Sequence, residues 1–174
     1  PDGSGVVYVP KDTRTSRIQQ FNISAQRELT RSTALTLAYV GTRGDNLTAV
    51  TSVAGFSGGI QGRLTTVANV ATSKYDSLQV QLRQSSWAGL SYLASYTFGH
   101  ATNDSPGPFP GAGSNFRSTP TDARNLGLDE GNADFDIRHR FTLAATYELP
   151  FFKDNWLLGG WALNAIVTLQ TGNY

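Results

Sequence analysis

The chain has 174 residues, a net charge of +1 and only 16 % charged residues, well below the ~25 % usual in soluble domains. Its balanced charge argues against nucleic acid as a partner, and the absence of cysteine excludes disulfides, thiolate metal sites and a cysteine nucleophile. No apolar run approaches the ~20 residues that a helical membrane span needs.

The first predicted elements are a polar N-terminal loop, residues 1–16, and two strands joined by a tight turn. Over residues 19–29, apolar residues such as Phe21 alternate with polar ones. This period of two is typical of a strand with one apolar and one polar face. Residues 34–42 show the same pattern after a turn at 30–32.

A long connection, residues 43–74, follows the first strand pair. Its stretches 47–53 and 64–72 are predicted either as two extra strands or as a hairpin standing above a membrane. The second pair of strands is predicted over residues 75–84 and 89–100, where alternation is again strict.

A second long connection, residues 101–134, is rich in proline and glycine. It leads to a third pair of strands, 135–149 and 156–170, joined by a turn at 150–155. Short turns thus alternate with long loops, as in outer-membrane barrels with periplasmic turns and external loops. The sequence predicts one all-β domain: an antiparallel, up-and-down β-barrel or barrel-wall segment with six principal strands and two possible extra ones.

The alternation also predicts which side chains share a face. One continuous apolar belt is expected at Leu78, Val80, Leu82, Leu90, Tyr92, Phe141, Leu143, Leu163 and Val167. Aromatic residues near the strand ends fit the girdles that Tyr and Trp form at membrane interfaces. These are Tyr75, Phe98, Phe135, Tyr147, Phe151, Phe152, Trp156 and Trp161.

Motifs in the three hairpins resemble one known family. The segments IQQFNIS (18–24), YDSLQV (75–80), DFDIRHRF (134–141) and YELP (147–150) occur in this order. They resemble the barrel of TonB-dependent receptors, in particular the Oar-like group with a carboxypeptidase-regulatory-like N-terminal domain. The resemblance covers roughly residues 17–174 and only a late portion of that barrel. It implies a location in the bacterial outer membrane and a non-enzymatic role in a transport protein.

Two functions of different classes remain open. The first is the non-catalytic wall of a TonB-dependent-receptor-like outer-membrane protein, as an excerpt of a larger barrel. The second is a structural subunit at the cell surface or outside the cell, which self-assembles by strand pairing into an oligomer or filament. Six open strands leave two unpaired edges, and barrels of this kind begin at about eight strands. The expected partners are therefore the lipid bilayer, other copies of the chain or further strands.

Residues for chemistry are few, and no enzyme or cofactor is predicted. The GFSGG segment at 55–59 fits a nucleophile motif but lacks the following helix that the motif requires. His100 and His139 are expected near each other, as polar strand ends. The acidic run, residues 129–136, can offer oxygen ligands to Ca²⁺. The favoured alternative is that its carboxylates form ordinary hydrogen bonds with Arg138 and Arg140. Its candidate ligands are Asp129, Glu130, Asn132, Asp134 and Asp136.

Overall fold

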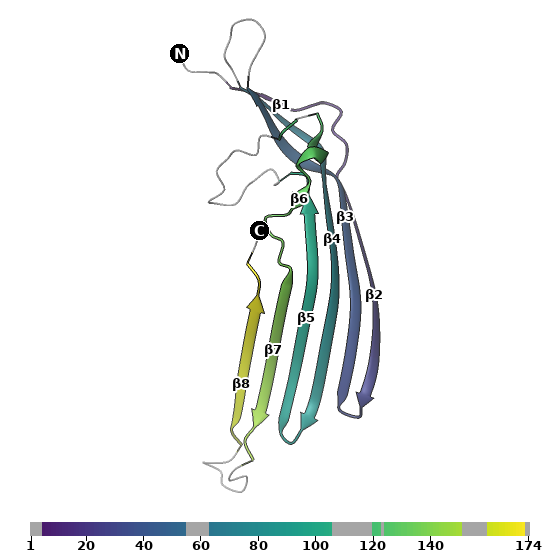
Figure 1. Ribbon diagram of the computed structural model, residues 1–174, viewed down its shortest axis with the longest axis vertical. Helices are drawn as coiled ribbons and strands as arrows, with labels where there is room; N and C mark the ends of the chain where they lie inside the picture. Colours follow the sequence, from purple (N-terminus) through teal and green to yellow (C-terminus); the bar gives the residue numbers. More distant parts are fainter. Residues whose placement is uncertain (1–4, 55–62, 106–119, 123, 151–159, 173–174) are drawn as a thin grey trace, which may run out of the picture.

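The structure, a computed structural model, describes residues 5–54, 63–105, 120–122, 124–150 and 160–172. These residues form one eight-stranded sheet (Figure 1). The strands are β1 (Gly5–Tyr8), β2 (Arg17–Thr30), β3 (Thr33–Ala54), β4 (Arg63–Trp87), β5 (Leu90–Asn103), β6 (Gly131–Asn132), β7 (His139–Glu148) and β8 (Ala162–Gln170), with one 3-10 helix, η1 (Leu126–Asp129). Within the described ranges no helix is long and apolar enough to cross a membrane.

The long strands follow one another in space as they do in sequence, in the order β2-β3-β4-β5-β7-β8. Every neighbouring pair in this series is antiparallel. The up-and-down fold class is therefore confirmed. Among the described residues the sheet does not close on itself, because β2 pairs only with β3 and β8 only with β7.

The first long connection is shorter than the sequence indicated, whereas the second keeps its predicted length, since β5 ends at Asn103 and β7 begins only at His139 and not at residue 135. β3 continues to Ala54 and β4 begins at Arg63, with regular pairs such as Ala49 with Ala68. The stretches 47–53 and 64–72 therefore lengthen β3 and β4 into a projecting hairpin and do not form two separate extra strands. At ~3.3 Å per residue, the 25 residues of β4 extend about 80 Å. A transmembrane strand needs only ~9–11 residues.

The two extra strands are instead short ones in segments expected to be loops. β1, inside the predicted N-terminal loop 1–16, pairs in parallel with the upper part of β4. β6, inside the predicted loop 101–134, pairs with the end of β5. Neither can be recognised by alternation, because each is only a few residues long and depends on a distant partner.

Few apolar side chains are buried in this single-layered sheet. The buried hydrophobic residues that the structure describes are Ala49, Ala71, Ala101, Leu126 and Ala133. Leu126 of η1 packs with Ala49, Ala71 and Leu47, which gives the projecting hairpin a small core of its own. Large residues such as Ile23 (72 % exposed) and Leu169 (62 %) have no second layer to cover them. The sheet therefore needs an apolar environment or a partner for one of its faces.

The turn between β4 and β5 gives a first prediction. Ala88 and Gly89 both have positive φ, 50° and 84°, as in the tight hairpin turns that favour glycine. A Cβ on Gly89 would lie 2.8 Å from the carbonyl oxygen of Glu148. Gly89→Ala is expected to lower the free energy of unfolding by about 1–2 kcal/mol. Ala88→Gly, the matched control, should leave stability unchanged or raise it by up to about 1 kcal/mol. Urea titration of the refolded protein checks both, and equal losses would contradict this account.

Candidate functional site

The functional feature of this sheet is a pair of chemically opposite faces. Directly paired residues of neighbouring strands share a face, and successive residues of one strand alternate. Leu78 pairs with Phe98 and Val80 with Tyr96. Tyr96 in turn pairs with Phe141. All nine positions of the predicted belt lie on this apolar face, so the predicted register is confirmed. They are Leu78, Val80, Leu82, Leu90, Tyr92, Phe141, Leu143, Leu163 and Val167.

Aromatic residues border the apolar face at both ends. At the long-loop end the ring centroids of Phe21 and Tyr39 lie 6.0 Å apart, and those of Phe98 and His139 lie 5.1 Å apart. At the short-turn end Tyr147 pairs with Leu163. His139 and Tyr147 are eight positions apart on β7, which is about 27 Å along a strand. In a strand tilted by ~35–45° this length spans about 20 Å across the membrane, somewhat less than the apolar band ~25 Å tall that aromatic girdles enclose in such barrels.

Only some of the aromatic residues predicted for the girdles lie on the apolar face. Phe98 and Tyr147 lie on the apolar face. Tyr75 lies on the polar face, since it is two residues before Ser77, the partner of Gly99. There its ring packs over Gly99, where a Cβ would be 3.0 Å from the Tyr75 hydroxyl oxygen. Phe151, Phe152 and Trp156 lie outside the described residues.

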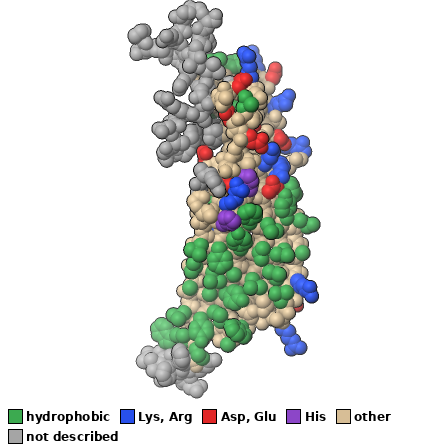
Figure 2. All heavy atoms as spheres, viewed as in Figure 1, with side chains coloured by type: hydrophobic (Ala, Val, Ile, Leu, Met, Phe, Trp, Pro, Cys, Tyr) green, Lys and Arg blue, Asp and Glu red, His purple; other side chains and the backbone are tan. Residues whose placement is uncertain are grey.

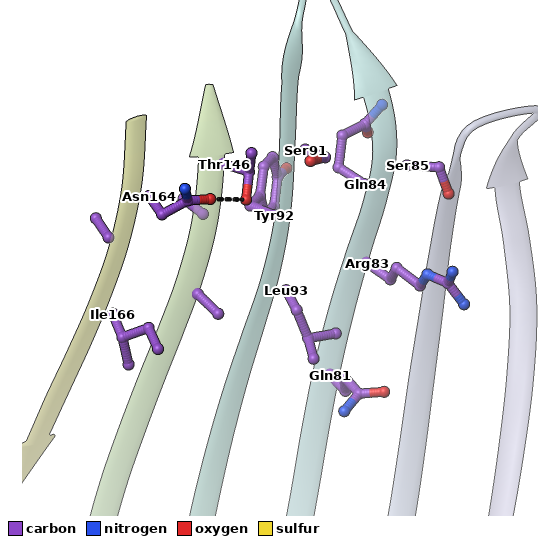
Figure 3. Close-up of a pocket in the computed structure, with 13 residues that line it drawn as sticks. Gln81, Arg83, Gln84, Ser85, Ser91, Tyr92, Leu93, Thr146, Asn164 and Ile166 are labelled. Carbon is purple, nitrogen blue, oxygen red and sulfur yellow. Dashed lines mark hydrogen bonds between the residues drawn. The ribbon is translucent and has the colours of Figure 1, made fainter. Parts of the chain in front are cut away.

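Charged and apolar side chains are separated along the strands. Figure 2 shows the hydrophobic side chains gathered over the lower sheet and the charged ones mostly above them. On the opposite face, hydroxyl and amide groups follow one another. Thr146 of β7 donates to the Asn164 side-chain oxygen of β8 at 2.7 Å, as Figure 3 shows. A hollow there is lined by Gln81, Arg83, Ser91, Leu93, Thr146 and Asn164, among others.

A polar cluster lies where the apolar face ends. Arg43 donates to both carboxylate oxygens of Asp76, at 2.8 and 3.0 Å. The Tyr39 hydroxyl donates to the same carboxylate. Asp76 shares a row with Gly41 and Phe21, one step beyond the row of Leu78 and Phe98. The hydrogen bonds, first from Arg43 and then from Tyr39, lower its pKa. The carboxylate therefore stays charged and holds β3 to β4 at this boundary.

Two buried carboxylates secure the strand ends further up. Asp136, only 1 % exposed, accepts the Ala101 backbone N–H at 2.7 Å and Arg138 Nε at 3.1 Å. Asp104, 7 % exposed, accepts both the backbone N–H and the hydroxyl of Thr72. Each aspartate takes the place of a missing neighbouring strand, because β5 loses β7 near Ala101 and β4 loses β5 near Thr72.

The structure does not gather the candidate Ca²⁺ ligands. Among the described residues no three acidic or histidine side chains are placed to hold a metal ion. The candidates have separate partners: Asp129 accepts from Thr121, Glu130 pairs with Lys74 at 2.9 Å, Asn132 contacts His100 and Arg138, Asp136 binds Ala101 and Arg138, and Asp134 is exposed. The acidic run thus mainly fastens the connection to the sheet.

The two histidines occupy neighbouring positions on the apolar face. His139 pairs with Phe98, two residues before His100. Their ring nitrogens have different partners: His139 Nδ1 lies 2.7 Å from the Tyr96 hydroxyl, and His100 Nε2 lies 2.9 Å from Asn132 Oδ1. The GFSGG segment lies outside the described residues.

Comparison with known proteins fits this geometry. The sequence pattern of the outer membrane beta barrel domain matches residues 1–174. The chain belongs to the outer membrane β-barrel domain family. This outer membrane β-barrel domain is thus placed in the bacterial outer membrane, as predicted. No curated protein and no solved structure matches it.

Sequence reasoning missed several residues that shape this outer membrane β-barrel domain. The roles of Asp76, Asp104 and Asp136 depend on partners 32 to 37 positions away in sequence. The only local signal is an aspartate close to a strand end. Such a signal marks many loops, and it does not reveal which backbone group the carboxylate binds.

Proposed function

We propose that this domain is a non-catalytic part of the wall of a closed outer-membrane barrel of the TonB-dependent-receptor type. The apolar face contacts lipid, and the polar face lines the lumen. The observation that carries the proposal is the apolar face itself. It is continuous over six strands, bordered by aromatic residues and uncovered by any other described element.

The two open edges support pairing with further strands. In lipid each unpaired backbone group costs several kcal/mol, and β2 and β8 each have one edge that no described strand pairs. Six long strands are fewer than the smallest barrels of this architecture. Continuation of the sheet beyond β2 and β8, within a larger wall, satisfies both edges.

A second candidate is a self-assembling subunit in which the additional strands come from other copies. The six long strands are antiparallel in series, so β8 runs antiparallel to β2. β8 of one copy placed beside β2 of the next therefore continues the same up-and-down pattern with all long loops on one side. Such head-to-tail contacts form a ring when the rotation closes and a filament when it does not.

Single-cysteine labelling tests the lipid-facing proposal, since the chain has no cysteine of its own. Leu143→Cys and Val167→Cys, labelled with an environment-sensitive fluorophore in vesicles, should be quenched by spin-labelled lipid. Thr142→Cys and Thr168→Cys, the adjacent positions on the polar face, should respond to aqueous iodide. Equal lipid quenching at both pairs of sites would overturn the proposal.

A cross-linking arm separates the two candidates. Ile23→Cys on β2 and Val167→Cys on β8 are combined in one chain and oxidised in the membrane. A ladder of covalent multimers indicates pairing between copies and favours the self-assembling subunit. Monomers alone, with lipid quenching at Leu143, favour a wall completed by other strands.

A further inference from the structure

Arg27 is a cation on the apolar face. It pairs with Leu35 across β2 and β3, and Leu35 pairs with Leu82. Ala25, the preceding residue on the same face, pairs with Leu37. The guanidinium group therefore projects from a part of the face whose neighbouring residues are apolar.

No described residue satisfies this cation, because Arg27 has neither a hydrogen bond nor an ion pair within the described ranges. The cations near the long-loop end differ: Arg43 is bonded to Asp76, and Lys74 is bonded to Glu130. The acidic residues nearest the short turns, Glu28 and Glu148, lie on the polar face with Ala34 and Ala162. The short-turn end of the apolar face is thus positive and has no described carboxylate.

Depth in the membrane follows from the stagger of the strands. Arg27 lies four positions before Arg31 of the β2–β3 turn, about 13 Å along the strand. Strands of such barrels tilt by ~35–45°, so residues paired across the sheet lie at different depths. Arg27 and Leu143 lie in the same paired row of the sheet. Towards the short turns, β2 ends three residues after Arg27, whereas β7 continues for five residues beyond Leu143. Arg27 is therefore closer to the short-turn boundary than Leu143 is, and a long side chain can direct its charge to that boundary.

We propose that Arg27, assisted by Arg31, binds the phosphate of a phospholipid headgroup in the leaflet at the short-turn end. The inference rests on the proposed lipid-facing role of the apolar face. A guanidinium group suits this ligand, because its planar set of donors can contact two phosphate oxygens at once. The bound lipid neutralises a charge that no described side chain neutralises.

Solid-state NMR tests the contact directly. The protein carries ¹³C in its arginine guanidinium carbons and is refolded into phosphatidylcholine and phosphatidylglycerol vesicles in phosphate-free buffer. Dephasing of the guanidinium signal by ³¹P reports proximity to lipid phosphate. Arg27→Gln should remove the Arg27 part of this dephasing. Arg27→Lys keeps the positive charge. Circular dichroism of Arg27→Lys and Arg27→Gln shows whether each variant folds. Arg83→Gln, which removes an arginine from the polar face, should leave the dephasing unchanged.

Unchanged dephasing in Arg27→Gln, or an equal loss in Arg83→Gln, would overturn the inference. So would a contact that appears only when inorganic phosphate is added, or a guanidinium contact to a carboxylate carbon of an adjacent strand. The labelled Leu143→Cys variant separates this failure from a failure of the proposed function. If lipid quenches Leu143→Cys while Arg27 shows no ³¹P contact, only the headgroup site is wrong.

Discussion

Replacing Leu143 with arginine is expected to destabilise the membrane-inserted protein by about 2–4 kcal/mol, the cost of a cation near the middle of a lipid-facing strand. Leu143 lies between Ala94 of β5 and Val167 of β8 on the apolar face. Its position in the middle of β7 leaves a new guanidinium group far from either aromatic girdle. Denaturant unfolding in lipid vesicles, followed by tryptophan fluorescence, measures the loss.

Thr142→Arg is the matched control for this substitution. Thr142 is the adjacent residue and lies on the polar face, paired with Ser95 and Thr168. An arginine there remains among hydroxyl groups, and its effect should stay below about 1 kcal/mol. If Thr142→Arg proves as harmful as Leu143→Arg, the polar face is not the solvated one.

Asp136→Ala is expected to lower the free energy of unfolding by about 1–3 kcal/mol, because it leaves the buried Ala101 N–H without its acceptor. Arg138 also loses a partner, but it is 25 % exposed and can turn to water. The connection before β7 should loosen at the same time, since Asp136 and Ala133 fasten it to Ala101. Chemical denaturation, with hydrogen exchange at Ala101, measures both effects.

Two further variants serve as controls for the Asp136→Ala prediction. Asp136→Asn keeps a carbonyl oxygen for the Ala101 N–H and should cost less than Asp136→Ala. Asp134→Ala removes an exposed carboxylate of the same segment and should change stability by no more than about 0.5 kcal/mol. A loss in Asp134→Ala comparable with that of Asp136→Ala would assign the effect to the charge of the loop.

The faces of the sheet could be predicted from sequence because alternation is a local property. Leu78 and Val80 reveal their face without knowledge of their partners, and pairing with Phe98 and Tyr96 then agrees. The upper parts of β3 and β4 could not be predicted in this way. Residues such as Thr48 and Ala49 are small or polar, so they show no contrast between faces. What keeps them in strands is pairing with Asn69 and Ala68.

The polar contacts were the least predictable part of the candidate site. From sequence alone, an aspartate such as Asp136 is equally compatible with a calcium-binding loop, a solvated turn or a side chain that accepts a hydrogen bond from the end of a strand. The choice depends on the unpaired N–H of Ala101, 35 positions earlier. The acidic composition of residues 129–136 indicated a polar connection. The partner of each carboxylate, however, is set by tertiary structure and not by the local sequence.

The passage of β3 and β4 beyond the apolar face has a thermodynamic consequence. One continuous pair of strands is stabilised in its lower part by lipid and in its upper part by a small water-exposed core around Leu126. Denaturants dissolved in water act on the upper part first, because only that part exchanges contacts with aqueous solvent during unfolding. Loss of structure should therefore occur in two transitions, with the projecting hairpin melting while the barrel wall persists, so a single two-state midpoint does not describe the domain.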